Sequence, residues 1–589
     1  MTPLTLLATG VASYRPYLQS SGELHDPVFG EPTQYGTAYH AFCHAVLATA
    51  GPVEARATHL SDATRGLDAT LTHTGNPTLT PSAAGFSRAT GAVRRSNHRD
   101  FTWPPILKTY RILAAEGVDR SKEFAERIAA VDIEQSFRSR PPSNWASVWL
   151  AGEWVRIREG LSTYTRSDVD GWLGGFLDDL LRPDDGFFFE PGKPNSYDLF
   201  TRFHVADLLW EGYDGRWQGE LERLMETGLE RSLAVQMSDG SLASAHRSTG
   251  QTWTVGAEIA YFTHAANFFA ERDDNDRAQR AADGARLAFA SMQRWQRPGA
   301  PFSPVENLLP PGFRVGYEGY TADGHYGNLA LAFLATAVLA GFGSDELPAT
   351  EPAATRDAAT RVEHEPTFRG VAHAGRYSLA LNADPAPAYD GFGTTDLTVG
   401  PRRHLQFASS VKHMESGAFV NLGLARRTEP GRSALDILAQ RTFTLTQPIE
   451  ALPPTSLPSG AAGLSLRATS AATETPTAQP GLDYELTATV RPDGVEVTEA
   501  TPGLVGYRTL LVPYVRDTGT GIHTTVEQTA DGVRLVHGDE TVAVTVDGTV
   551  EAIVVLPHGF ENRRGLCGLV RLDLDEPADR ISYRVFVVR

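Results

Sequence analysis

Residues 143–159, with the sequence SNWASVWLAGEWVRIRE, decide the predicted fold of the first half of the chain. A polar Ser-Asn-Trp start is followed by apolar residues at positions i, i+3 and i+4, the spacing of one face of an α-helix. The same spacing runs over ten or more residues in the stretches 38–50, 106–115, 199–210, 257–270 and 329–339. This half of the chain is therefore predicted to be helical.

Polar loops centred on Asn or Arg recur between these helices. They are Ser96-Asn97-His98-Arg99-Asp100, Ser143-Asn144-Trp145, Asn195-Ser196-Tyr197-Asp198 and His246-Arg247-Ser248. Their central residues (Asn97, Asn144, Asn195 and Arg247) are 47, 51 and 52 residues apart, about the length of a helical hairpin with its loops. Successive hairpins bring such loops to one end of the assembly. We therefore predict an α/α toroid over residues 1–343; the alternative is chance spacing among polar loops.

The second half of the chain has a different pattern. Residues 344–366 are rich in Pro, Ala, Thr and acidic residues and are predicted to be a linker. Short, alternating, β-branched stretches follow, among them 377–382, 418–424, 484–490, 541–546 and 582–588. This pattern predicts an antiparallel β-sandwich over residues 367–589, with a loop at 453–481 that crosses between sheets. The predicted fold class is α+β multidomain, with an N-terminal α/α toroid of helical hairpins and a C-terminal antiparallel β-sandwich.

Composition excludes several classes of protein. The 589 residues include 53 Lys and Arg against 71 Asp and Glu, a net charge of −18, which argues against nucleic-acid and polybasic membrane binding. No apolar run reaches the roughly 18 residues that a membrane helix needs. Two cysteines, Cys43 and Cys567, exclude a disulfide framework and a cysteine zinc site. His40 and His44 share a helix face, but without a zinc motif they are interpreted as packing, so no metal or cofactor is expected.

The N-terminus, residues 1–7, has no basic segment and too short an apolar run for a secretory signal. The expected location is therefore the cytoplasm, or outside the cell if a signal peptide has been removed. A cytoplasmic enzyme of this kind would meet imported oligosaccharides, so we expect exolytic action on short chains.

The predicted rim loops gather side chains that suit carbohydrate. Aromatic faces stack on sugar rings, and Asn, Gln and Arg bind hydroxyls and carboxylates. A fifth segment, 316–326 (GYEGYTADGHY), adds three Tyr and one His. Each residue alone could equally be a helix cap or part of the core. The candidate substrate-binding residues are Asn97, Arg99, Trp145, Asn195, Asp198, Gln251, Tyr317, Tyr320 and, from the β-half, Arg402.

Two motifs resemble the polysaccharide lyases built from an α/α toroid and antiparallel β-domains: the hyaluronan, chondroitin and xanthan lyases, with oligoalginate and heparinase II-type relatives. Asn144-Trp145 followed by Gly152-Glu153 is similar to their Asn-Trp helix. Asp185-Gly186-Phe187-Phe188 is similar to the Asp-Gly-Ser-Phe turn that precedes their catalytic His and Tyr. The resemblance implies Tyr197 as the tyrosine. Glu190 and Pro191 stand where the His is expected, so His98 or His325 is the candidate base.

β-Elimination at a uronic acid needs three roles. One group neutralises the carboxylate, with Asn144, Asn97 and Arg247 as candidates. A base removes the C5 proton, and Tyr197 or Tyr320 protonates the leaving oxygen. The predicted function is thus a lyase that cleaves uronic-acid-containing oligo- or polysaccharides. The alternatives are a uronate epimerase, a non-catalytic carbohydrate-binding protein and, chiefly, a glycoside hydrolase with paired carboxylates among Asp198, Glu318, Asp323 and Glu190.

Overall fold

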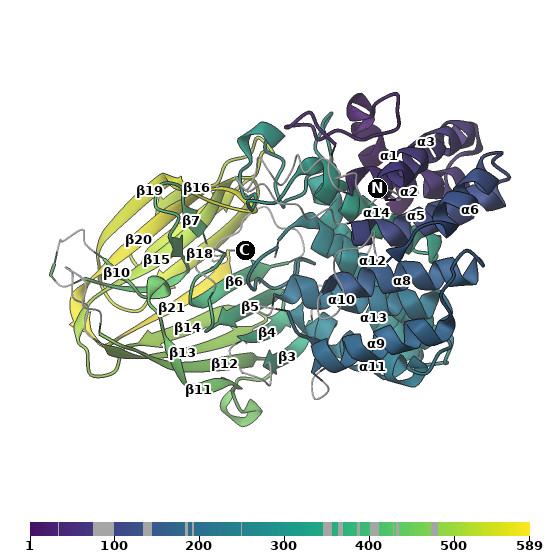
Figure 1. The fold of residues 1–589 in the computed structure, drawn as a ribbon. Coiled ribbons are helices and arrows are strands. Elements are labelled where there is room, and N and C mark those ends of the chain that lie inside the picture. Colours follow the sequence, from purple (N-terminus) through teal and green to yellow (C-terminus); the bar gives the residue numbers. More distant parts are fainter. Residues whose placement is uncertain are drawn as a thin grey trace. The chain divides into compact units, whose positions relative to one another are not determined.

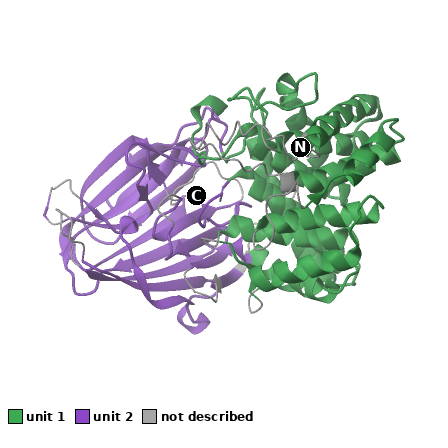
Figure 2. Ribbon diagram, in the orientation of Figure 1, with its two compact units in different colours: residues 1–233, 251–306, 311–350 green, residues 234–250, 307–310, 351–589 purple. Residues whose placement is uncertain are grey.

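The chain forms two compact units in a computed structural model (Figure 2). Unit 1 comprises residues 1–233, 251–306 and 311–350, and unit 2 comprises residues 234–250, 307–310 and 351–589. The residues that the structure describes are 1–32, 35–74, 99–133, 144–182, 186–190, 194–248, 250–344, 356–362, 369–385, 389–400, 411–427, 429–430, 435–472 and 481–588.

Unit 1 is an α/α toroid. Its inner helices contact one another in the order α2, α5, α8, α10, α12 and α14, and α14 contacts α2 again, so the ring is closed (Figure 1). The bounds of these helices are α2 (Gly36–Ala50), α5 (Arg99–Ala115), α8 (Asn144–Arg158), α10 (Asn195–Trp210), α12 (Thr252–Ala270) and α14 (Asn328–Leu339). The predicted toroid is confirmed.

Outer helices alternate with the inner ones along the chain. They are α1 (Pro3–Ser13), α3 (Arg56–Thr74), α6 (Ser121–Ala129), α9 (Arg166–Leu180), α11 (Gln218–Val235) and α13 (Asn275–Met292). Helix α13 contacts α12, α3 contacts α2, and α9 contacts α8. A short antiparallel pair, β1 (Leu181–Arg182) and β2 (Phe187–Phe188), links α9 to α10.

Burial explains which helices lie inside. Every residue of α12 from Thr252 to Ala265 is buried, because the helix is covered on all sides. In contrast, α13 buries only one side, which includes Ala281 and Ala285, and its charged residues face solvent. Inner helices also approach closely: a Cβ on Gly256 of α12 would lie 2.8 Å from the carbonyl oxygen of Ala330 on α14.

Unit 2 is an antiparallel β-sandwich, as predicted. One sheet has the order β11-β12-β13-β14-β21-β18-β17-β16, and two others have the orders β10-β9-β15-β20-β19-β7-β8 and β3-β4-β5-β6. An isolated bridge between Thr394 and Leu422 joins the latter two into one layer. The strands of the first sheet are β11 (Thr444–Ala451), β12 (Ala462–Ser470), β13 (Leu482–Arg491), β14 (Gly494–Ala500), β16 (Thr525–Gln528), β17 (Gly532–His537), β18 (Glu540–Val546) and β21 (Arg580–Val587).

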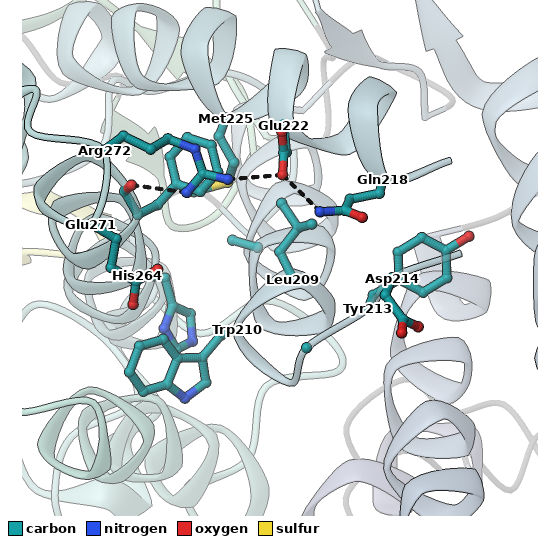
Figure 3. Close-up of a pocket in the computed structure, with 13 residues that line it drawn as sticks. Leu209, Trp210, Tyr213, Asp214, Gln218, Glu222, Met225, His264, Glu271 and Arg272 are labelled. Atoms are coloured by element: carbon teal, nitrogen blue, oxygen red, sulfur yellow. Dashed lines mark hydrogen bonds and ion pairs between the residues drawn. The ribbon is translucent and has the colours of Figure 1, made fainter. Parts of the chain in front are cut away.

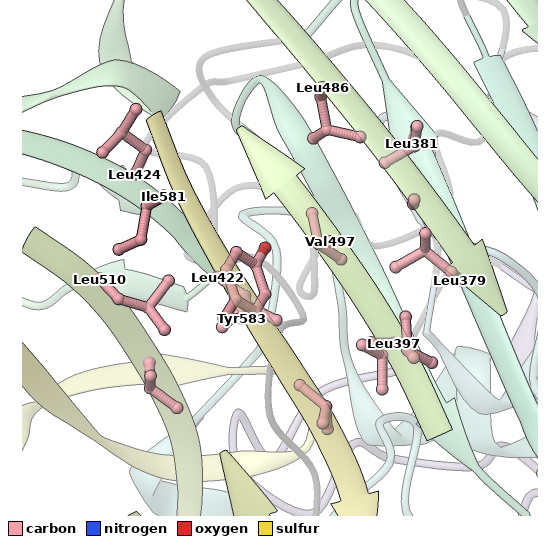
Figure 4. Packing of buried hydrophobic residues seen from close by; sticks show 14 of the residues in the cluster. Leu379, Leu381, Leu397, Leu422, Leu424, Leu486, Val497, Leu510, Ile581 and Tyr583 are labelled. Carbon is pink, nitrogen blue, oxygen red and sulfur yellow. The ribbon is translucent and has the colours of Figure 1, made fainter. Parts of the chain in front are cut away.

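The core of unit 2 lies between these two layers. Leu379, Leu510 and Val497 come from the three different sheets and belong to the same buried cluster (Figure 4). The opposing layer consists of β3 (Arg356–Val362), β4 (Arg369–Gly375), β5 (Tyr377–Asn382), β6 (Gly393–Val399), β7 (Val411–His413), β8 (Phe419–Val420), β9 (Gly423–Arg427), β10 (Asp436–Ile437), β15 (Gly506–Asp517), β19 (Val550–Asn562) and β20 (Gly565–Ala578).

Three sequence expectations differ from this arrangement. The predicted loop 453–481 contains β12, whose residues Ala462 to Ser470 pair in unbroken register with β13, because its alternating Leu and Ala side chains are buried. The predicted linker 344–366 contains β3. Residues 234–250 group with the β-sandwich, where Ser244 Oγ donates to the Asp396 carboxylate at 2.8 Å.

Candidate functional site

Aromatic side chains at the starts of the six inner helices contact one another. They come from the first two turns of these helices, from the residue before α2, and from the π-turn η5 (Asp323–Gly327) that leads into α14. We call this set the rim ring: Tyr35, Phe101, Trp145, Tyr197, Phe200, Trp253 and Tyr326. Since these residues are distant in sequence, their contacts show that all six inner helices begin at the same end of the toroid.

One half of the rim ring is centred on Phe101 of α5. Tyr35 stacks on Phe101 with ring centroids 5.3 Å apart, and Phe200 of α10 stacks on it at 5.4 Å. Trp145 of α8 meets Phe101 edge-on at 5.9 Å. These contacts connect the starts of α2, α5, α8 and α10.

The other half closes the circuit. Tyr197 lies 6.4 Å from Phe200 and 5.8 Å from Trp253 of α12. Trp253 lies 6.3 Å from Tyr326, which in turn lies 6.1 Å from Tyr35. The aromatic circuit therefore passes through the starts of α2, α5, α10, α12 and α14, and Trp145 of α8 joins it through Phe101.

Accessibility differs among the tyrosines of this end. Tyr35 and Tyr326 are buried, and burial raises the pKa of both phenols well above the ordinary value, so they stay protonated at neutral pH. Tyr197 is partly exposed, as is Tyr320, whose ring lies 6.0 Å from that of Tyr326. The phenols of Tyr197 and Tyr320 are thus accessible to a ligand.

Electrostatics favour an anion at this end of the toroid. Each helix start carries a partial positive charge from its unpaired backbone N–H groups. Six inner helices begin here, and helix starts are common sites for carboxylates and phosphates. A locally positive end is therefore compatible with the net negative charge of the chain.

The interior below the rim ring is filled. Phe203 packs edge-on against Phe333 with centroids 4.7 Å apart, and His204 contacts both rings. Farther along the helices, Lys108 Nζ donates to the buried Asp207 carboxylate at 2.6 Å. A sugar chain therefore cannot thread through the toroid.

Asn144 and Asn195 are the first residues of α8 and α10 and are buried. The side-chain oxygen of Asn144 has no hydrogen-bond partner among the described residues. This oxygen can therefore accept a hydrogen bond beside Trp145 of the rim ring.

Gln251 holds an aromatic residue in place. Its side-chain oxygen accepts from Trp253 Nε1 at 3.2 Å, and its Nε2 donates to Thr321 Oγ1 at 2.9 Å. The side chain is buried, so we assign it to orienting the Trp253 ring rather than to binding substrate directly.

His325 is enclosed by the rim ring. Its ring lies 4.8 Å from that of Tyr35 and 4.6 Å from that of Tyr326, and the residue is 0% exposed. The Tyr320 carbonyl oxygen, 3.1 Å away, can only accept, so the Nε2 atom of His325 carries the proton. Burial lowers the pKa of His325 to about 3, and the ring is neutral at physiological pH.

Asp198 is held by buried cations. Its carboxylate accepts from Arg202 at 2.6 Å, from Arg231 at 2.8 Å and from the Phe188 backbone N–H at 2.8 Å. Although burial opposes ionisation, the two arginines hold the pKa of Asp198 below its ordinary value. These contacts give Asp198 a structural role, and the expected substrate contact stays a prediction.

Replacing Asp198 with Ala is expected to destabilise unit 1 by about 3–5 kcal/mol, because Arg202 and Arg231 would remain buried without a counter-charge. Urea unfolding followed by the helical circular dichroism signal measures the loss. The matched control Asp178→Ala removes an exposed carboxylate from α9 and should stay within about 0.5 kcal/mol of the wild type. Equal stability of the two variants would contradict the structural role.

Tyr317 also belongs to a buried polar network. Its hydroxyl donates to the Asp323 carboxylate at 2.8 Å and accepts from Arg297 at 3.0 Å. Arg297 pairs directly with Asp323 at 2.6 Å. This network fixes the segment before α14, and the expected sugar contact of Tyr317 stays a prediction.

His246 and Arg247 belong to unit 2. The backbone there is strained, because His246 and Ser248 have φ values of 62° and 61°, a region that non-glycine residues rarely adopt. The His246 ring lies 5.0 Å from Tyr389, and its backbone N–H donates to Asp390 at 2.7 Å. Strain of this kind is frequent at functional sites, so Arg247 remains a candidate.

Four candidates are not described at the side-chain level. Asn97, His98 and Arg402 lie outside the described residues, and Arg99 is described only as the first residue of α5. Their proposed roles therefore stay predictions.

The histidines of α2 form a hydrogen-bonded chain. His40 Nδ1 lies 2.9 Å from Asn328 Oδ1, His44 Nε2 lies 3.2 Å from His40 Nε2, and His44 Nδ1 lies 2.8 Å from His59. Within the described ranges, no group of three or more His, Cys, Asp or Glu side chains is arranged to hold a metal ion.

None of the described helices combines the length and apolar character that a bilayer crossing requires.

Sequence reasoning named Trp145 and Tyr197 of the rim ring as candidates and included Tyr326 in the segment 316–326. Tyr35, Phe101, Phe200 and Trp253 were not expected at the site. The available signal was positional: an aromatic residue stands at or near the start of each predicted inner helix.

No protein-family model and no curated protein matches the chain. Similar solved structures include a variant of the Streptomyces coelicolor chondroitin AC lyase, with a TM-score of 0.46, 12% identity, and coverage of 99% of this chain and 79% of that chain. Heparinase III has a TM-score of 0.33 at 12% identity, covering 87% and 79%. A glycosyl hydrolase family 88 protein from Bacteroides vulgatus has a TM-score of 0.39 at 12% identity, covering 58% and 99%.

Proposed function

We propose that the chain is a carbohydrate-active enzyme, and specifically a lyase that cleaves uronic-acid-containing oligo- or polysaccharides by β-elimination. The observation that carries the proposal is the rim ring: seven aromatic side chains at the shared start of six inner helices, with Tyr197 partly exposed among them. Aromatic faces suit sugar rings, and the helix starts suit the uronate carboxylate.

The reaction requires two proton transfers. A base removes the proton from C5 of the uronate, the C4–O bond breaks as the C4=C5 double bond forms, and the leaving oxygen takes up a proton. Neutralising the carboxylate makes the C5 proton acidic, because the negative charge that develops there is stabilised. No oxidant or cofactor is needed.

We assign the roles as follows. Tyr197, the accessible phenol of the rim ring, gives the proton to the leaving oxygen, as the resemblance to the lyases implies. Asn144, at the start of α8 beside Trp145 of the rim ring, binds the carboxylate through the N–H groups of its side-chain amide. His325 is enclosed between Tyr35 and Tyr326. We therefore assign the role of base to His98, which lies next to Asn97 in one of the polar loops.

The hydrolase alternative has less support in the geometry. It needs two carboxylates at the scissile bond. Of the candidates, Asp198 is held by two arginines, and Asp323 is held by Arg297 and Tyr317. Carboxylates fixed in buried ion pairs are poorly placed to act as acid or nucleophile, so these two of the four candidate carboxylates do not favour a hydrolase.

We further propose that the lyase acts exolytically on short chains. The filled interior around Phe203 and Phe333 gives the rim a floor. A chain end can rest on such a floor, whereas a tunnel would suit a long polymer. A rapid fall in the viscosity of an intact polymer would contradict this part alone.

The test is incubation with oligosaccharides of hyaluronan, chondroitin, heparosan and alginate, followed by ultraviolet absorbance and reducing-end assays. We expect absorbance from the C4=C5 unsaturated uronate with at least one of them, rising in step with new reducing ends. New reducing ends without this absorbance would replace the lyase proposal with the hydrolase.

A further inference from the structure

A second pocket lies in unit 1, at the opposite end of the inner helices from the rim ring. It has a volume of about 290 Å³ and is lined by the ends of α10 and α12, the start of α11 and the turn before it (Figure 3). A volume near 300 Å³ is at the lower end for small-molecule sites and fits one or two sugar rings.

Trp210, the last residue of α10, gives this pocket an exposed aromatic surface. The residue is 42% exposed, although tryptophan is usually well buried. Its ring stacks on His264 with centroids 5.3 Å apart, and His264 stacks on Phe203 at 5.9 Å. The indole is therefore held on a three-ring stack and presents a preformed apolar platform.

His264, which supports Trp210, is anchored by the buried Asp207. Its Nε2 lies 3.3 Å from an oxygen of Asp207. Although burial opposes ionisation, Lys108 and His264 hold the pKa of Asp207 below its ordinary value, so this oxygen accepts and Nε2 carries the proton. The other ring nitrogen, Nδ1, is buried and has no hydrogen-bond partner among the described residues.

The charges around the pocket are largely paired. Glu222 accepts from Arg272 at 2.8 Å and from Gln218 at 3.0 Å. Asp214 pairs with Arg166 at 2.6 Å. Inner helices end here, so their carbonyl dipoles disfavour an anion and favour hydroxyl donors. The pocket therefore disfavours an anionic ligand and suits a ligand with several hydroxyl groups.

We propose that this pocket is a second carbohydrate-binding site that takes a neutral mono- or disaccharide, stacked on the exposed ring of Trp210. The site is separate from the rim ring and does not depend on the lyase reaction. Its chemistry is opposite to that of the rim, where helix starts favour a carboxylate.

The test is isothermal titration of the full chain with a panel of neutral sugars, namely the methyl glycosides of glucose, galactose and mannose together with cellobiose and lactose, and with glucuronate as the charged probe. We expect at least one neutral sugar to bind and glucuronate to bind at least tenfold more weakly at this site. Trp210→Ala should weaken the neutral sugar at least tenfold, and Trp210→Phe should retain most of the binding.

Two control variants test whether the neutral sugar binds in the pocket at Trp210. Phe313→Ala removes another exposed aromatic side chain, 70% exposed and absent from the pocket, and should leave binding unchanged. Tyr197→Phe alters the rim ring and should also leave it unchanged. The proposal is overturned if no neutral sugar of the panel binds, if Trp210→Ala binds as tightly as the wild type, or if Tyr197→Phe abolishes the binding.

Discussion

Replacing Tyr197 with Phe is expected to lower kcat for uronate elimination by about 100- to 10,000-fold, the range typical of a lost acid–base group. KM should change little, because the phenyl ring still contacts Trp253 and Phe200 in the rim ring. Initial rates of unsaturated-uronate formation over a range of substrate concentrations measure both quantities.

Tyr320→Phe is the matched control, since it removes the other accessible phenol of this end. The Tyr320 backbone oxygen, which accepts from His325, is untouched by the substitution. We expect a much smaller fall in kcat than for Tyr197→Phe. Near wild-type turnover in Tyr197→Phe together with a large loss in Tyr320→Phe would transfer the proton-donor role to Tyr320.

Acid should destabilise the toroid strongly between about pH 6.5 and 4. Burial lowers the pKa of His40 to about 4 and that of His204 and His325 to about 3. Unfolded histidines titrate near 6.5, so below that pH the unfolded chain binds more protons than the folded one. Each such histidine then lowers the free energy of unfolding by about 1.4 kcal/mol for every unit by which the pH falls. The loss levels off below the pKa that the histidine has in the folded chain.

Urea unfolding of the helical signal at several pH values measures this slope. His204→Phe is the informative variant: both ring nitrogens of His204 are buried without hydrogen-bond partners among the described residues, and its neighbours are Phe200, Phe203 and Phe333. The variant should reduce the slope by about 1.4 kcal/mol per pH unit. His558→Phe changes an exposed histidine and should leave the slope unchanged; an unaltered slope in His204→Phe would reject the assignment.

The sequence identified the inner helices better than the outer ones. The six stretches chosen for their apolar spacing, from 38–50 to 329–339, all fall within inner helices. A helix surrounded by other helices must be apolar on nearly every face, whereas α13 needs only one apolar side. Burial on all sides therefore leaves a stronger pattern in the sequence than burial on one side.

Candidate site residues were predicted less completely. Asn144, Trp145, Asn195 and Tyr197 do stand at the starts of inner helices, as the spacing of the polar loops indicated. Asp198 shares its loop with Tyr197, yet it pairs with Arg231, 33 positions away. Nothing in the local sequence distinguishes a carboxylate that faces a ligand from one that faces a buried arginine.

By itself, the sequence determined the two fold types, because helical and strand periodicities are local and repeat along each element. Only the tertiary structure decided that Tyr35, Phe101 and Trp253 belong to one aromatic circuit, since ring closure brings α14 back against α2 across almost 300 positions. It also decided that residues 234–250 group with the β-sandwich. Such contacts depend on which surfaces remain to be buried after the helices form, and that is a property of the whole fold.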